Sequence, residues 1–166
     1  AFQNIMRRFL KGDENMVNDV MWALPHHSAS DGKCNYITAQ TGFTLWDLVS
    51  YDCKHNEANG ENNTDGPDYN YSWNCGAEGP SRKRAVMTLR KNQVRNAFAL
   101  LLLAQGTPCI LAGDEFYNSQ KGNNNVYCQD NEPGWVDWNK LKTDDTLFNY
   151  VRELIAFRKK HPCLHR

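Results

Sequence analysis

The segment 84–105 constrains the fold of this chain more than any other. Its apolar residues recur at the spacing of one helical face, and they comprise Val86, Leu89, Val94, Ala97, Phe98, Leu101 and Leu102. Leu100 and Leu103 extend the apolar surface, which predicts a helix that is buried near its end. Gly106 ends this helix, and the apolar run 108–112 then predicts a buried strand.

The same alternation occurs elsewhere along the chain. Residues 35–39 predict a short strand, residues 17–24 predict a helix, and residues 147–160 predict a final helix. The order strand, long loop, helix, strand, long loop, helix predicts an α/β fold with parallel strands. Two strands cannot close an eight-stranded barrel, so we expect residues 1–166 to form a single domain that is part of a (β/α)8 barrel.

Two long polar loops follow the predicted strands, which is where a β/α barrel carries its site. Residues 52–80 and 117–139 are rich in amides, and interleaved aromatic residues favour an ordered loop over disorder. Amide side chains can donate to and accept from sugar hydroxyls, so the loops suit a neutral polyhydroxylated ligand. The alternative is that Asn and Gly serve only the conformation of the loops.

Charge and cysteine content exclude several classes of protein. Lys plus Arg and Asp plus Glu both number 19, so we expect no nucleic acid and no membrane as partner. The six cysteines form no Cys-x-x-Cys pair, and Cys109 in its apolar run is expected to be a buried reduced thiol, which favours a cytoplasmic location. Segment 61–66 imitates a calcium loop, but Ser72 replaces the bidentate Glu, so no metal is expected.

Seven stretches carry distinctive motifs: RRFLKGD (7–13), DLVSY (47–51), KHNEANGEN (54–62), SWNCG (72–76), GTP (106–108), LAGDEF (111–116) and GNNNVYCQDN (122–131). Together they resemble glycogen debranching enzymes of the isoamylase type, which belong to the α-amylase clan of glycoside hydrolases. The resemblance implies the last strands and helices of a TIM-type barrel, α-glucan as partner, and no cofactor. It also implies retaining cleavage of α-1,6 linkages by an Asp nucleophile and a Glu acid/base, both ahead of this chain, which is therefore expected to be inactive alone.

The stretch NYITAQTGFT (35–44) resembles the family motif Thr-Ala-His-Asp-Gly-Phe-Thr. In the family this Asp is the third catalytic carboxylate, and the His binds the same sugar. Here Gln40 replaces the His and Thr41 replaces the Asp, so one hydrogen-bonding side chain is kept and one charge is lost. The chain is then a fragment of a debranching hydrolase or, alternatively, a non-catalytic glucan-binding or regulatory relative; a third alternative is a purely structural interaction module.

The remaining candidates lie after the second predicted strand. Asp114 and Glu115 are expected to line or support the cleft. The consecutive amides Asn123, Asn124 and Asn125 are expected either to contact the glucan or only to shape their loop, and Trp135 and Trp138 either to stack on sugar or to be buried. A partial barrel is also expected to expose apolar surface and to self-associate.

Overall fold

A computed structural model describes residues 2–26 and 34–165. Its helices are α1 (Phe2–Lys11), α2 (Val17–Ala23), α3 (Leu45–Leu48), α4 (Arg84–Leu103), α5 (Asn139–Thr143) and α6 (Thr146–Lys160). Single 3-10 turns are η2 (Glu57–Asn59), η3 (Asp114–Phe116), η4 (Val126–Cys128) and η5 (Pro162–Leu164). The strands are β1 (Cys34–Asn35) and β2 (Thr107–Pro108), which pair in parallel with Asn35 opposite Pro108.

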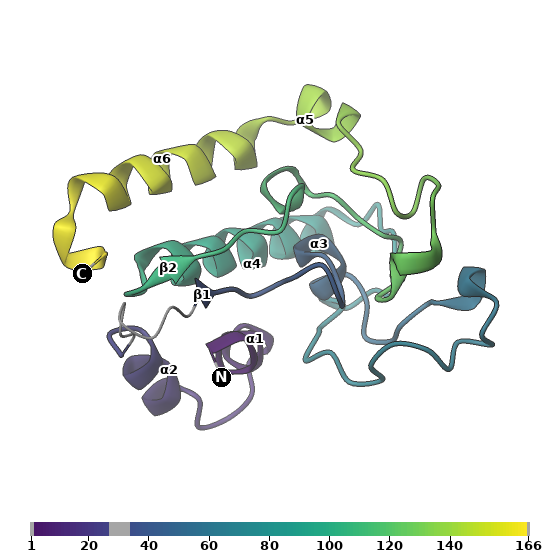
Figure 1. Cartoon of the computed structure of the whole chain (residues 1–166), viewed down its shortest axis with the longest axis horizontal. Helices are drawn as coiled ribbons and strands as arrows, with labels where there is room; N and C mark the ends of the chain where they lie inside the picture. Colours follow the sequence, from purple (N-terminus) through teal and green to yellow (C-terminus); the bar gives the residue numbers. More distant parts are fainter. Residues whose placement is uncertain (1, 27–33, 166) are drawn as a thin grey trace.

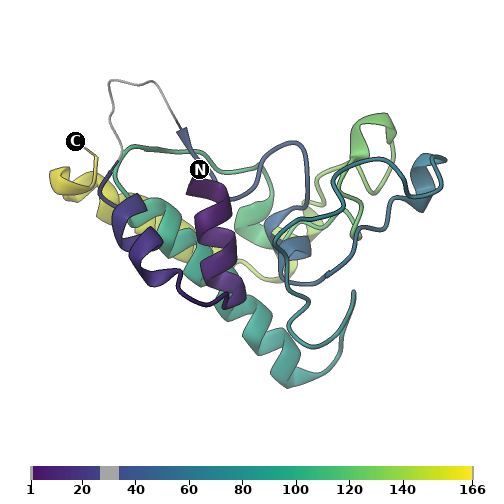
Figure 2. The same cartoon turned by 90° about the horizontal axis from the view of Figure 1, so that it is seen from below.

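Helix α4 lies at the centre of the molecule, with α6 along one side and α1 on the other (Figure 1). Its buried face, which includes Val94, Phe98 and Leu102, packs in one core with Met6 of α1 and Leu147 of α6. The two polar loops extend together from the same end of the molecule (Figures 1 and 2). The predicted helices are thus confirmed as α2, α4 and α6, although Leu103 at the end of α4 remains 37% exposed.

The predicted strands are much shorter than expected. Among the described residues, only 34–35 and 107–108 pair as strands, and the amide of Cys109 donates to the carbonyl of Asn35 at 2.7 Å before the two segments part. Two residues farther along, the carbonyl of Ile37 accepts hydrogen bonds from two side chains of α1. It is therefore not free to accept a hydrogen bond from a neighbouring strand. Cys109 is exposed, so its predicted burial is wrong: no described segment covers that side of β2.

The entry into β2 is held by α6. Arg158 is buried, and its Nη1 donates to the carbonyls of Leu102 and Ala104 at 2.7 and 2.6 Å, while its Nη2 donates to that of Gly106. The Leu102 carbonyl belongs to the last turn of α4, whose carbonyls have no partner within the helix, and the other two follow the helix end. The Arg158 guanidinium therefore fixes the path from α4 to the strand and its site. None of the described helices is long and apolar enough to cross a membrane.

Candidate functional site

A hollow of about 450 Å³ lies where the segments after β1 and β2 run side by side. Gln40 and Thr41 line it from the first segment, and Cys109 and Ala112 line it from the second. Both candidate residues of the first segment are exposed. The structure therefore brings Gln40 and Thr41 to the strand ends, where a β/α arrangement places its site.

Asp114 supports this hollow from behind. The side chain is 2% exposed, and its carboxylate accepts hydrogen bonds from the Thr38 hydroxyl and, at 2.9 Å, from the Leu45 amide. Burial raises the pKa of Asp114 to about 7, although the bonds from Thr38 and Leu45 act in the opposite direction. Asp114 thus braces the segment that carries Gln40 and Thr41 without facing the hollow itself.

Glu115 points elsewhere. Its carboxylate accepts from the Gly113 amide at 2.9 Å and lines a second cavity of about 300 Å³ between the β2 segment and α6. Phe148 and Val151 give that cavity an apolar wall. The two adjacent carboxylates, Asp114 and Glu115, therefore lie in different surroundings and do not form an acid/base pair.

Two buried charged residues position the site without having been singled out from the sequence. The Arg7 guanidinium donates to the carbonyls of Ile37 and Asn70 at 2.8 and 3.1 Å, and burial lowers its pKa to about 10. The Asp47 carboxylate accepts from the Ser119 hydroxyl at 2.5 Å and the Gln120 amide at 2.8 Å. Both lie within the quoted motifs 7–13 and 47–51, and Asp47 is the charged residue of an otherwise apolar short helix, α3.

A buried amide network ties the two polar loops together. Asn124 is 1% exposed, and its Oδ1 accepts from Asn56 Nδ2 at 2.8 Å. In return, the Asn124 backbone amide donates to Asn56 Oδ1 at 2.9 Å. Asn124 Nδ2 donates to Asn70 Oδ1 and to the Pro67 carbonyl, both at 2.9 Å. Every polar atom of the Asn124 side chain is therefore bound within the protein.

The neighbouring amides extend the same network. Asn123 is 3% exposed and donates to Asn59 Oδ1 at 2.8 Å, while the half-buried Asn125 donates to Asp65 Oδ2 at 2.8 Å. Hydrogen bonds from Asn59 and Asn125 lower the pKa of Asp65. The geometry favours the loop-shaping alternative for Asn123 and Asn124, and their contact with a glucan stays a prediction.

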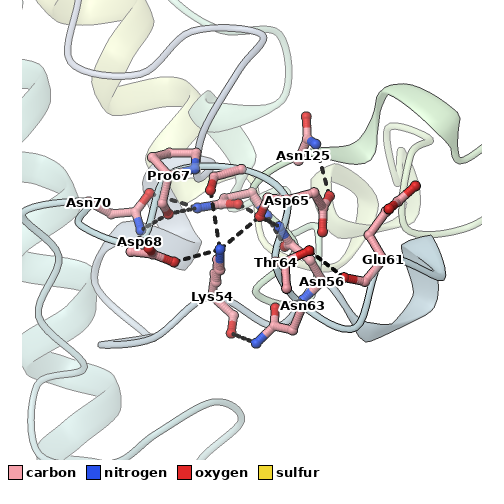
Figure 3. Close-up of polar contacts among 12 residues, drawn as sticks. Lys54, Asn56, Glu61, Asn63, Thr64, Asp65, Pro67, Asp68, Asn70 and Asn125 are labelled. Carbon is pink, nitrogen blue, oxygen red and sulfur yellow. Dashed lines mark hydrogen bonds and ion pairs between the residues drawn. The ribbon is translucent and has the colours of Figure 1, made fainter.

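Lys54 holds the centre of the first loop (Figure 3). Its buried ammonium donates to the Asp65 carbonyl at 2.9 Å and pairs with Asp68 Oδ1 at 2.6 Å. Asp65 belongs to the segment that imitates a calcium loop, but its carboxylate accepts hydrogen bonds from the side-chain amides of Asn59 and Asn125. The described residues contain no cluster of three or more His, Cys, Asp or Glu side chains that could hold a metal ion.

The two tryptophans of the second loop are not buried. Trp135 is 59% exposed and its Nε1 donates to Asp130 Oδ1 at 3.0 Å, whereas Trp138 is 63% exposed and lies against Phe116 with ring centroids 5.4 Å apart. Both rings keep a free face, so the burial alternative does not hold for them.

Curated relatives match this chain over most of its length. It is 52% identical over 132 residues to a glycogen operon protein GlgX homolog of Mycobacterium tuberculosis, a match covering 80% of the chain and 18% of the relative. It is 51% identical over 132 residues to a glycogen debranching enzyme of Erwinia tasmaniensis, covering 80% and 20%. Identity to isoamylase 1 of Arabidopsis thaliana, which is chloroplastic, is 41% over 170 residues, covering 95% and 21%. The chain thus spans about a fifth of these relatives' length.

Solved structures show the same relationship in three dimensions. A pullulanase from Bacillus acidopullulyticus superposes with a TM-score of 0.68 at 21% identity, covering 98% of this chain and 19% of the pullulanase. A pullulanase from Anoxybacillus sp. LM18-11, complexed with maltotetraose, gives a TM-score of 0.64 at 26% identity, covering 95% and 20%. No family profile matches the chain. The motifs, the relatives and the shared fold agree, and this chain belongs to the family of glycogen debranching enzymes and isoamylases, the debranching glycoside hydrolases of the α-amylase clan.

Proposed function

We propose that this chain is the C-terminal part of the catalytic barrel of an α-1,6-glucan debranching hydrolase, where it forms one wall of the glucan cleft. The observation that carries the proposal is the hollow at the strand ends, with Gln40 and Thr41 exposed in it. In the family motif these two positions contact the sugar at the cleavage site. Helix α1, Asp114 and the amide network hold the wall in place.

The chemistry of the hollow suits a neutral glucan. The Gln40 amide can both donate to and accept from sugar hydroxyls, and the Thr41 hydroxyl can do the same on a shorter side chain. Pullulanases with the same fold have been solved with maltotetraose and maltotriose bound. These structures support an α-glucan, such as glycogen, starch or limit dextrin, as the ligand of this chain.

The hollow lacks the groups that hydrolysis needs. The described residues that line it include no carboxylate and no imidazole, and Asp114 lies buried behind Thr38. Retaining hydrolysis requires two carboxyl groups about 5–5.5 Å apart across the scissile bond. We therefore assign the nucleophile and the acid/base to other parts of the whole enzyme and expect the chain alone to be inactive.

A non-catalytic glucan-binding or regulatory relative is the second candidate. Gln40 and Thr41 favour it, because they stand where the family has a His and a catalytic Asp. The sequence that precedes this chain in its whole protein separates the two candidates. An Asp nucleophile and a Glu acid/base there support the hydrolase, and their replacement supports the binding protein.

Titration of the chain with maltotetraose, followed by calorimetry, tests the glucan assignment. Gln40→Ala is expected to weaken binding about fivefold to tenfold, because one hydrogen bond contributes about 1 kcal/mol. Thr143→Ala, on the exposed side of α5, is the matched control and should leave binding unchanged. Equal binding by both variants would exclude the hollow as the glucan site, and release of reducing ends from pullulan by the pure chain would exclude the assignment of catalysis elsewhere.

A further inference from the structure

A third cavity, of about 230 Å³, shares no lining residue with the strand-end hollow. It lies between α3, the first half of α4 and the turn at Gly79–Ser81, and it is closed by Ser119 of the second loop and Lys140 of α5. Figure 2 shows α4 beginning beside the first polar loop, where this turn leads into the helix. Nothing in the proposed glucan site uses this cavity.

Two cations line the cavity without a counter-ion. Arg90 is 1% exposed, and its guanidinium donates only to backbone carbonyls, among them Gly79 at 2.7 Å and Asn74 at 3.0 Å. The half-buried Lys140 donates to the Tyr117 carbonyl at 2.7 Å, which leaves two of its N–H groups for another acceptor. Within residues 2–26 and 34–165, neither cation makes an ion pair, and no acidic side chain lines the cavity.

Three further basic residues follow the lining turn in the sequence. Arg82, Lys83 and Arg84 follow the lining residue Ser81 directly, and all three are exposed. Here α4 begins, and the N-terminus of a 20-residue helix carries a partial positive charge and free amides. This concentration of cations stands out in a chain with 19 basic and 19 acidic residues.

The acidic groups nearest the cavity are already engaged. Asp47 and Asp137 both interact electrostatically with Lys140. The Asp47 carboxylate accepts from the Ser119 hydroxyl and from two loop amides, and burial raises its pKa. The exposed Asp137 carboxylate accepts from the Asn139 amide. Glu78 accepts from the Asp52 and Cys53 amides and pairs with His55 on the adjoining loop. None of these three carboxylates lines the cavity.

The uncharged lining points to a small ligand that combines an anion with a ring. Trp46, Tyr51 and Met87 form the apolar wall, and hydroxyls of three serines lie among them. The Ser50 hydroxyl is buried and has no hydrogen-bond partner among the described residues. The volume is below the roughly 300 Å³ at which pockets for drug-sized ligands begin, which favours a single sugar unit over a nucleotide.

We propose that this cavity binds a sugar phosphate, with the phosphate at Lys140 and the start of α4 and the sugar ring against Trp46. Phosphate dianions are the ligands that helix N-termini and uncompensated cations recognise together. The ligand is a small effector or product-like molecule and is distinct from the neutral glucan of the strand-end hollow. Its occupation would join α3, α4, the second loop and α5.

Calorimetric titration of the chain with glucose 1-phosphate, inorganic phosphate and glucose tests the proposal. Glucose 1-phosphate is expected to bind most tightly and glucose not measurably. Lys140→Gln should weaken binding of glucose 1-phosphate about tenfold, because a charge-assisted hydrogen bond contributes about 1.5 kcal/mol or more, and Lys140→Arg should restore most of it. Lys142→Gln, on the exposed side of the same helix α5, is the matched control and should have no effect.

Two further variants keep the test decisive if Lys140→Gln disturbs folding. Ser81→Asp places a carboxylate at the mouth and should abolish binding of both phosphates, with the folded state checked by circular dichroism. Trp46→Leu should weaken glucose 1-phosphate more than inorganic phosphate. Glucose binding as tightly as glucose 1-phosphate, equal losses in Lys140→Gln and Lys142→Gln, or no saturable binding of any phosphate by the folded chain would each overturn the proposal.

Discussion

The hydroxyl of Thr38 donates a hydrogen bond to the buried carboxylate of Asp114, and this bond joins the segment after β1 to the turn after β2. The same carboxylate accepts from the amide of Leu45, where α3 begins. A single carboxyl group thus sets the position of the stretch between them, which carries Gln40 and Thr41. The state of this carboxyl group should therefore be visible both in stability and in glucan binding.

We expect the stability of the chain to fall as pH rises through the titration of Asp114. Its pKa is about 7 in the folded chain and near 3.8 when exposed, so the folded state holds a proton that the unfolded state releases. The contribution is complete below about pH 4 and is lost by about pH 7, a change on the order of 4 kcal/mol. Urea unfolding at several pH values should show this fall in the natural chain. Asp114→Asn should make the fall smaller, and the part that remains is expected from Asp47, whose pKa is also raised by burial. A variant profile identical to that of the natural chain would show that Asp114 does not cause the fall.

Asp144 serves as a control for this pH dependence, because its pKa is shifted in the opposite direction from that of Asp114. Its pKa is lowered to about 2, first by the hydrogen bond from Lys91, and it pairs with the Lys91 ammonium at 2.7 Å. A lowered pKa means that the contribution is present above about pH 4 and is lost as pH falls toward 2. Asp144→Asn should flatten the acid side of the stability profile and leave the range between pH 4 and 7 as it is. Loss of the pH 4–7 slope in this variant would contradict the assignment of that slope to Asp114.

Removing the amide of Asn124 should destabilise the chain by about 2–4 kcal/mol. Asn124→Ala leaves the buried Asn70 Oδ1 unsatisfied, which costs about 1–3 kcal/mol. It also removes one hydrogen bond each from Asn56 Nδ2 and the Pro67 carbonyl, which keep the Asp65 carbonyl and Asn70 Nδ2 as partners. The free energy of unfolding in urea measures the effect, with the exposed Asn139→Ala as control. A change below 0.5 kcal/mol would show that the network does not hold the loops together.

Restoring the family residues at the strand end should raise turnover. In a whole protein that carries the nucleophile and the acid/base, Thr41→Asp together with Gln40→His is expected to increase kcat about a hundredfold. The reason is that an electrostatic contact at the cleavage subsite is stronger in the transition state than in the ground state. KM should change less than kcat. Unchanged turnover in the double variant would mean that Thr41 does not occupy the position of the third carboxylate.

We expect the chain to self-associate through the cavity between the β2 segment and α6. Ile110, Phe148 and Ile155 give this cavity of about 300 Å³ a mainly apolar, partly exposed lining, and such surface promotes association. Sedimentation velocity at increasing concentration should show it, and Phe148→Ser should reduce it. Phe157→Ser, an exposed position of α6 outside the cavity, is the control. A monomer at every concentration would contradict this prediction.

Prediction from the sequence was most accurate for helices whose own residues show a clear apolar periodicity. The apolar periodicity of α4 and α6 predicted both helices almost to their ends, because that periodicity is local and extends over several turns. Helix α1 was not predicted, although its motif was noted, and α3 and α5 are too short for periodicity to show. The predicted strands were too long, because pairing depends on partners far along the chain rather than on the strand's own residues.

The sequence by itself determined the family and the order of the main elements. It did so because long motifs and helical periodicity are properties of consecutive residues. Only the tertiary structure decided which polar side chains face a cavity and which are buried and hydrogen-bonded within the protein. Asn124 and Asn56 lie 68 positions apart and bind each other, and Arg90 is buried among carbonyls of a loop that precedes it. No local pattern specifies such pairings, because each depends on where distant segments meet once the core has packed.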